Sequence, residues 1–155
     1  MRAAELADEG LGLDAIVAEL RRIQERSGLL LTVDTLKYLK RSGRVGKARA
    51  FLGSLFDLKP ILGLDHEGIV IPVDKARGRA ATVQRVLDIL EDKVPPERAR
   101  LRMGVAHVDS PDVASTLVAA FEQRFQPDEV LVRPAASVLA AHTGPGAWAV
   151  FYQVE

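Results

Sequence analysis

The alternation of apolar and polar positions predicts a chain of short helices and strands. Apolar residues recur at three- and four-residue intervals from Leu13 to Ile23 and from Val83 to Leu90, which is the spacing of amphipathic helices. Shorter runs rich in Leu, Ile and Val are bounded by turn residues and indicate strands. The expected strands span residues 28–33, 59–64, 68–73, 101–108, 129–133 and 147–154.

Turn and cap residues predict the connections between these elements. The segment from Asp65 to Gly68 is typical of a tight hairpin, and Ser110-Pro111-Asp112 is a helix start that leads to Phe125. Further helices are expected after Asp34 or Thr35 and over residues 47–56, 79–92 and 135–141. About six strands and as many helices, with one hairpin and several helical crossovers, predict an α+β fold. Its sheet should be mostly antiparallel or mixed, with helices covering it.

The composition of the chain argues against several classes of function. The 155 residues suit one domain, and the balance of 21 Lys and Arg against 21 Asp and Glu argues against nucleic-acid binding. There is no cysteine, and the three histidines lie far apart, so no metal site or cofactor is expected. No apolar run is long enough to span a bilayer, and acidic Glu5 and Asp8 are atypical of a signal peptide. A cytoplasmic bacterial protein is the simplest interpretation.

The segment His142-Thr143-Gly144-Pro145-Gly146, here called the His142 turn, is the first candidate site. Glycines on both sides of a proline permit backbone angles closed to other residues, and they let main-chain N–H groups approach a ligand. The histidine beside them offers one hydrogen-bond donor and one acceptor. The alternative is an ordinary tight turn with a satisfied histidine. His107 is expected to be a strand-end histidine satisfied by a loop carbonyl.

Basic residues gather in a second segment. Arg44 lies between glycines, and Lys47 and Arg49 fall near the start of the helix expected over residues 47–56. Cations there oppose the helix dipole at a cost of about 0.3–1 kcal/mol each, so they either serve a partner or are simply solvated. The loop lacks the Gly-Lys-Ser/Thr ending of a phosphate-binding loop, which argues against nucleotide binding.

Four motifs in order resemble the C-terminal lobe of the DegV family of bacterial fatty-acid-binding proteins. The resemblance covers the chain from about Ser27 to its end. The motifs are Leu36, Tyr38 and Leu39 before Arg41-Ser-Gly-Arg44; Gly53-Ser-Leu before Lys59-Pro60-Ile61-Leu62; Lys75-Ala-Arg77-Gly78; and the His142 turn.

The resemblance implies that a second lobe is missing. Family members carry an N-terminal lobe of comparable size, and residues 1–26 resemble the end of its last helix or the segment leading out of it. Residues 27–155 would then form a single domain that resembles the DegV C-terminal lobe and carries half of a binding site.

The family also implies a function, a carrier that presents a long-chain fatty acid of the palmitate or oleate type to a separate fatty acid kinase. The carrier itself would perform no chemistry. The implied head-group residues are His142, Thr143, Gly144, Gly146 and Arg77, with hydroxyl donors on the absent lobe. Partner docking is assigned to Arg44, Lys47 and Arg49, and the acyl pocket or a mobile lid to Phe51, Leu52 and Leu55.

Several alternatives stay open at this point. Arg77 is either a head-group ligand, a docking residue or a solvated cation, and the helix over 47–56 is either a lid that touches a membrane surface transiently or part of the core. A small hydrolase or transferase using His142 as base is the second functional hypothesis. Ser137, His142 and Asp109 offer the residue types of a triad, but there is no Gly-x-Ser-x-Gly motif. A regulatory or structural domain without its own ligand is the third.

Overall fold

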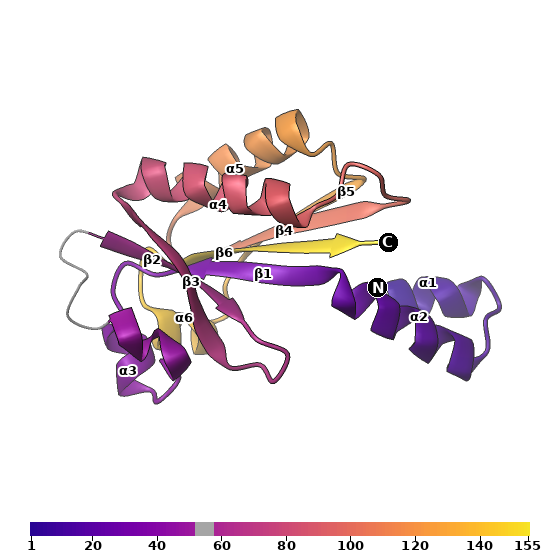
Figure 1. Ribbon diagram of the computed structural model, residues 1–155, viewed down its shortest axis with the longest axis horizontal. Helices are drawn as coiled ribbons and strands as arrows, with labels where there is room; N and C mark the ends of the chain where they lie inside the picture. Colours follow the sequence, from indigo (N-terminus) through magenta and orange to yellow (C-terminus); the bar gives the residue numbers. More distant parts are fainter. Residues whose placement is uncertain (52–57) are drawn as a thin grey trace.

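A six-stranded mixed sheet forms the centre of the molecule (Figure 1). The computed structural model describes residues 1–51 and 58–155. Its strands are β1 (Ser27–Thr32), β2 (Leu58–Leu64), β3 (Val70–Arg77), β4 (Leu101–His107), β5 (Glu129–Pro134) and β6 (Trp148–Val154). Its helices are α1 (Arg2–Asp8), α2 (Leu13–Glu25), α3 (Lys37–Arg41), the 3-10 helix η1 (Gly46–Phe51), α4 (Arg79–Lys93), α5 (Pro111–Arg124) and α6 (Ser137–Thr143).

The strand order is β3-β2-β1-β6-β4-β5, and only the pair β4–β5 is parallel among the described strands. A parallel pair needs a crossover connection, which α5 supplies between these two strands. The tight hairpin joins β2 to β3 around Asp65 to Gly68. The predicted α+β class with a mostly antiparallel, mixed sheet is therefore confirmed.

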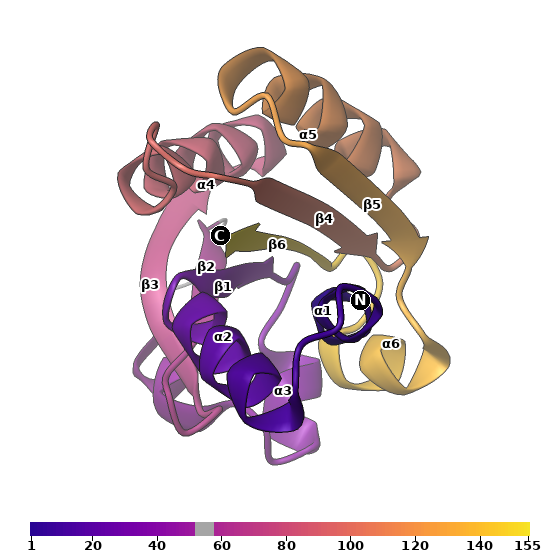
Figure 2. The same ribbon diagram turned by 90° about the vertical axis from the view of Figure 1, so that its right-hand side faces the viewer.

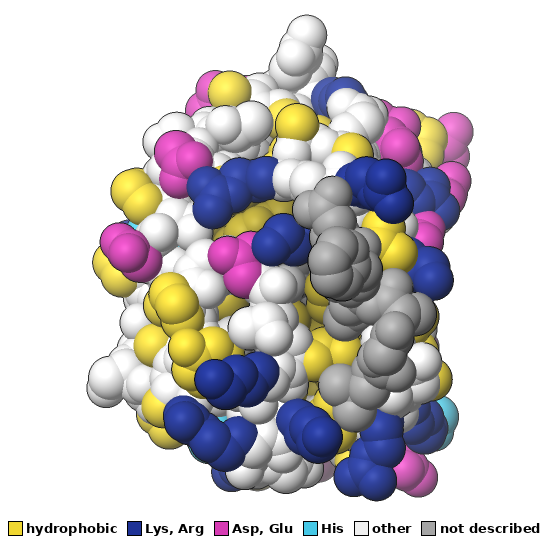
Figure 3. Space-filling view, turned by 90° about the vertical axis from the view of Figure 1, so that its left-hand side faces the viewer, with side chains coloured by type: hydrophobic (Ala, Val, Ile, Leu, Met, Phe, Trp, Pro, Cys, Tyr) yellow, Lys and Arg dark blue, Asp and Glu magenta, His cyan; other side chains and the backbone are white. Residues whose placement is uncertain are grey.

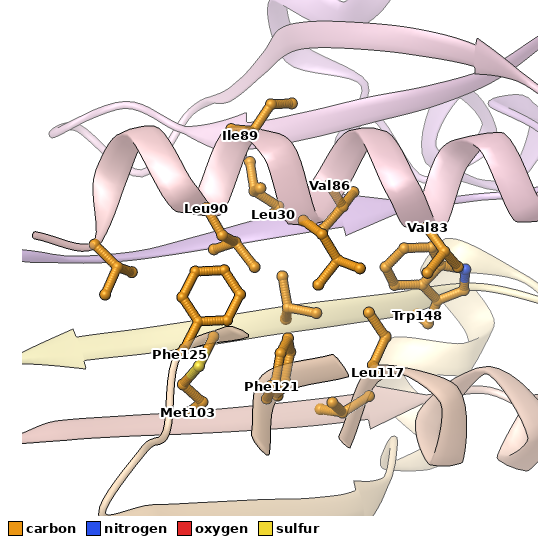
Figure 4. Close-up of a cluster of buried hydrophobic side chains, with 14 of the residues drawn as sticks. Leu30, Val83, Val86, Ile89, Leu90, Met103, Leu117, Phe121, Phe125 and Trp148 are labelled. Atoms are coloured by element: carbon orange, nitrogen blue, oxygen red, sulfur yellow. The ribbon is translucent and has the colours of Figure 1, made fainter. Parts of the chain in front are cut away.

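One face of the sheet is covered by α4 and α5 (Figures 1 and 2). Alternate residues of the central strands point toward these helices, as the twofold repeat of a strand requires. Figure 4 shows Leu30, Met103 and Trp148 from the strands meeting Leu90 and Phe121 from the two helices. The Phe121 ring is fully buried and lies edge-on to Phe125, with 6.2 Å between ring centroids. This is the main core.

The opposite face is covered only in part. At one end, α3 and η1 pack on it and form a second apolar cluster that includes Leu39, Ala48, Leu62 and Ala147. At the other end, the α1–α2 hairpin extends away from the sheet (Figure 1). The strands between these two ends keep apolar side chains without a covering helix, and this feature positions the candidate site.

Three predicted elements differ from the structure. The α-helix expected over 47–56 is a 3-10 helix over Gly46–Phe51, where Gly46 has φ +49° and its backbone approaches that of Val70. The rest of that prediction lies in 52–57, outside the described residues. The strand expected over 68–73 runs instead over Val70–Arg77, because it pairs with the whole of β2. The helix expected over 135–141 is shifted to Ser137–Thr143. None of the helices formed by the described residues is long and apolar enough to cross a membrane.

Candidate functional site: a bare sheet face and the His142 turn

The His142 turn begins inside α6, whose last two residues are His142 and Thr143. Gly144 and Gly146 then take φ values of +80° and +77°, which are strained for residues with a Cβ. The Thr143 side chain is buried, and its Oγ1 donates to Leu139 O at 2.9 Å. The threonine hydroxyl proton is therefore used within the helix, which the sequence did not indicate.

The two glycines make room for side chains that come from the end of β1 and from α3. A Cβ on Gly144 would overlap the ring of Tyr38, and a Cβ on Gly146 would overlap the carboxylate of Asp34. Asp34 Oδ1 also lies 2.9 Å from Lys59 Nζ. Internal packing thus explains both glycines, and Asp34 and Lys59 are neighbours of the turn that sequence reasoning had not placed there.

His142 is half-buried, and its Nδ1 is shielded from solvent without a hydrogen-bond partner among the described residues. A buried polar atom left unpaired costs about 1–3 kcal/mol. Such an atom is a ready position for a ligand group. His107 differs, because its Nδ1 accepts a hydrogen bond from Ser110 N at 3.2 Å. His107 is thus a satisfied strand-end histidine, but its partner is a loop N–H and not the expected carbonyl.

Arg77 and the His142 turn lie at the same end of the sheet but on different strands. Arg77 ends β3 and pairs with Leu58 at the start of β2, while Gly146 donates its N–H to Val108 O just beyond β4. The β3 strand lies three positions from β6 in the sheet, which is about 14 Å at the usual strand spacing. Arg77 and the His142 turn therefore share an edge of the molecule but lie on well-separated strands.

The Lys and Arg side chains of residues 35–51 face solvent beside this edge. This stretch has six Lys and Arg and no Asp or Glu. Figure 3 shows many Lys and Arg side chains on the corresponding face. Arg44 and Arg49 are exposed, whereas Lys47 Nζ pairs with Asp65 Oδ2 at 2.8 Å and thereby lowers the pKa of that carboxyl. Of the three predicted docking cations, Lys47 already has an acidic partner.

The bare part of the sheet forms a groove of about 930 Å³, here called the sheet groove. Its apolar floor includes Leu29, Leu64, Leu131 and Phe151, and the last three are 46%, 36% and 41% exposed. Its lining reaches Ala106, two residues before the Val108 carbonyl that binds the His142 turn. Leu52 and Leu55, predicted to line an acyl pocket, lie outside the described residues, and Phe51 packs beside the second cluster.

The far end of the sheet groove holds a buried ionic network that sequence reasoning missed. Arg102 is 6% exposed and pairs with Glu5 of α1, with Glu129 (Nε to Oε2, 3.1 Å) and with Glu155 (Nη1 to Oε1, 3.4 Å). Hydrogen bonding by Arg102, followed by that of Arg2, holds the pKa of the Glu5 carboxyl at about 2. This end of the groove therefore holds a network in which each carboxylate is paired with an arginine.

Hydrolytic chemistry has little support in this arrangement. Within residues 1–51 and 58–155, no hydrogen bond joins His142 to Ser137 or Asp109. The same residues contain no group of three or more His, Cys, Asp or Glu placed to hold a metal ion.

Comparison with known proteins identifies the family. The family model described as "Uncharacterised protein, DegV family" matches residues 1–155. This chain belongs to the DegV family. A DegV domain-containing protein of Streptomyces coelicolor is 33% identical over 147 residues, which are 94% of this chain and 51% of the relative.

Solved structures of DegV proteins share the fold. A fatty-acid-binding DegV family protein from Thermus thermophilus superposes with a TM-score of 0.93 at 35% identity, covering 99% of this chain and 55% of that one. The Fak B3 protein of the Streptococcus pneumoniae fatty acid kinase, solved loaded with linoleic acid, has a TM-score of 0.85 at 20% identity, covering 99% and 53%. This chain spans about half the length of the curated relatives it matches.

Proposed function

We propose that this chain is one half of a fatty-acid carrier, and that the sheet groove takes the acyl chain. The observation that carries this proposal is the apolar floor left bare on the sheet, about 930 Å³ in volume. Its lining ends at Ala106, two residues before the Val108 carbonyl that accepts the Gly146 N–H. That volume lies within the range of small-molecule sites, which are mostly apolar with a few polar groups that fix orientation. The Thermus thermophilus DegV protein, at 35% identity, is described by its fatty acid binding.

The charges at the two ends of the groove favour one orientation of the ligand. At one end, Arg102 is already paired with Glu5, Glu129 and Glu155, so a fatty-acid carboxylate there would have to compete with these carboxylates for it. At the other end, His142 Nδ1 has no partner among the described residues. We therefore place the carboxylate at the His142 turn, with backbone near Gly144 and Gly146 and the Thr143 oxygen as further polar groups.

A single lobe would bind weakly. The groove covers one side of an acyl chain, and one histidine does not offset the cost of burying a carboxylate. Because the DegV relatives are about twice as long, the remaining contacts belong in our proposal to a second half. The order of the domains, with residues 1–26 leading out of that half, stays a prediction.

We assign this chain no catalytic step, metal or cofactor. The name of the Streptococcus pneumoniae Fak B3 protein connects a protein of this fold with a fatty acid kinase. The exposed basic residues Arg44, Arg49 and Arg77 offer a docking surface for such an enzyme in the cytoplasm, and Lys47 would join them only by leaving Asp65. Transient contact of the same surface with an anionic membrane fits its charge.

A pair of matched substitutions tests the acyl site. Phe151 and Val73 are 41% and 39% exposed, both on strands, but only Phe151 lines the sheet groove. Titration of this chain with oleate below its micelle concentration should shift the NMR signals of Leu29, Gly104 and Phe151. Phe151→Asp should abolish these shifts and Val73→Asp should preserve them. Shifts confined to another surface, or equal loss in both variants, would overturn the proposal.

A further inference from the structure

The outer edge of β5 is unpaired in the described structure. This strand is the last in the sheet order and pairs only with β4, in parallel, from Glu129 to Pro134. Figure 2 shows it at the margin of the sheet, with α5 on one side and α6 on the other. A row of free N–H and C=O groups on such an edge is a template for a further strand. The opposite edge strand, β3, carries Pro72 and is flanked by η1, whose Gly46 approaches Val70.

The side chains of β5 carry a pattern that is complementary to itself. Glu129, Leu131 and Arg133 lie on the groove face of the strand, because Leu131 and Arg133 line the groove and Glu129 contacts Arg102. If two β5 strands pair antiparallel about Leu131, each Glu129 lies opposite Arg133 of the other strand. Opposite charges in such cross-strand pairs stabilise a sheet and like charges destabilise it. Parallel pairing in register would set like charges against each other.

The side chains of Arg133 and Glu129 can each take a further ion-pair partner. Arg133 Nη1 donates to Val132 O at 2.8 Å, and no ion pair of Arg133 occurs among the described residues. Glu129 shares Arg102 with two other carboxylates, those of Glu5 and Glu155. Glu5 and Glu155 also pair with Arg2, so the network is close to charge balance. Arg133 of the other copy would give Glu129 a second cationic partner at the strand edge.

Apolar surface accompanies this edge. Leu131 is 36% exposed at the centre of the strand. On the other face, a hollow of about 400 Å³ between α5 and β5 is lined by residues that include Val118, Ala119 and Val132. Pro134 has no N–H to donate, so it would end a new ladder at the limit of the charged pair.

We propose that two copies of this chain associate through β5, antiparallel about Leu131, so that their sheets become continuous. The interface is isologous, with Glu129 of each copy paired to Arg133 of the other. Because Leu131 and Arg133 line the sheet groove, the two grooves would meet at the twofold axis. The proposal does not depend on the identity of the ligand.

Charge reversal and its rescue test this interface by sedimentation equilibrium of the purified chain. The wild type should show a concentration-dependent monomer–dimer equilibrium. Arg133→Glu sets two pairs of like charges against each other and should raise the dissociation constant about tenfold or more. Glu129→Lys should do the same, with circular dichroism checking that loss of the Arg102 contact leaves the fold intact.

Mixing the two variants supplies the decisive measurement. A Glu129→Lys chain beside an Arg133→Glu chain restores opposite charges at both positions, so the mixture should form heterodimers at concentrations where each variant is monomeric. Lys40→Glu, an exposed reversal on α3, is the matched control and should leave the dissociation constant unchanged. A wild-type chain that stays monomeric up to about 500 µM, so that any dimer would have a millimolar or weaker dissociation constant, would overturn the proposal. A dimer that tolerates both reversals, or a mixture without rescue, would overturn it equally.

Discussion

The ring of Tyr38 lies directly against the Cα of Gly144, so that no larger residue fits between α3 and the His142 turn. The Asp34 carboxylate likewise lies against Gly146 and leaves no room for a Cβ there. The basic segment and the candidate head-group site are thus in direct contact. A shift of α3 would therefore displace the His142 turn through the contact between Tyr38 and Gly144.

Gly144→Ala should destabilise the fold by about 3 kcal/mol, because it combines a strained backbone with overlap on the Tyr38 ring. Gly43→Ala is the matched control, since Gly43 has φ +72° and no atom within 4 Å of an added Cβ. That variant should lose only about 1 kcal/mol. Urea unfolding followed by Trp148 fluorescence measures both values. Equal losses would mean that contact with Tyr38 contributes nothing.

His142→Ala should weaken fatty-acid binding when this chain is joined to the second half that DegV relatives possess. The expected loss is about 1–3 kcal/mol, the cost of leaving a buried partner unsatisfied, or roughly fivefold to 150-fold in dissociation constant. Isothermal calorimetry with oleate measures it. The isolated chain should bind oleate far more weakly than the joined protein. An unchanged constant in a folded His142→Ala variant would leave the histidine with a purely structural role.

Arg44→Glu and Arg77→Glu should impair coupling to a fatty acid kinase more than they impair lipid retention. Rim charges mainly govern encounter rates and their salt dependence, so phosphorylation of the bound lipid should slow and lose sensitivity to salt. Arg21→Glu on α2, an exposed reversal far from this surface, is the control. Loss of lipid binding with normal coupling would instead assign the arginine to the head-group site.

Acid should release α1 from the sheet. The pKa of Glu5 falls from 4.5 to about 2 in the folded protein, chiefly through its hydrogen bond with Arg102. A depressed carboxyl pKa contributes stability in full above pH 4.5, and the contribution is lost as the pH falls toward 2. Backbone NMR shifts of α1 should therefore lose their helical values over that range before the core strands change.

A charge-neutral variant provides the check on this mechanism. Glu5→Gln should show the released state of α1 already at pH 7, whereas Glu19→Gln should not. Glu19 also has a lowered pKa, but its ion-pair partner is Arg22, within α2. If α1 keeps its shifts at pH 3, or if Glu19→Gln has the same effect as Glu5→Gln, the Glu5–Arg102 contact does not hold the helix.

Local patterns predicted most of the fold because they report on local physics. The helical spacing from Val83 to Leu90 requires one buried face, and that face does pack on the sheet as α4. The hairpin around Asp65 and the helix start at Ser110 depend on turn and cap chemistry within a few residues. The order of the motifs was enough to indicate the DegV family, which the full-length match confirms.

The segment after Gly46 shows where local pattern fails. Its apolar spacing suits an α-helix, but a 3-10 helix forms over Gly46–Phe51 because Gly46 must approach the backbone of Val70. Likewise β3 continues to Arg77, beyond the expected end at residue 73, since it pairs with the whole of β2. Both outcomes depend on strands that are distant in the sequence.

The sequence by itself determined the types of most elements, the family and the candidate histidine, since each is encoded within a short window of residues. Only the tertiary structure decided which sheet face is bare, that Gly144 and Gly146 serve Tyr38 and Asp34, and that Glu5 binds Arg102. These features join residues up to 112 positions apart, as Asp34 and Gly146 are. No local periodicity records such pairs, because they arise from strand order and register, which form only when the whole sheet assembles.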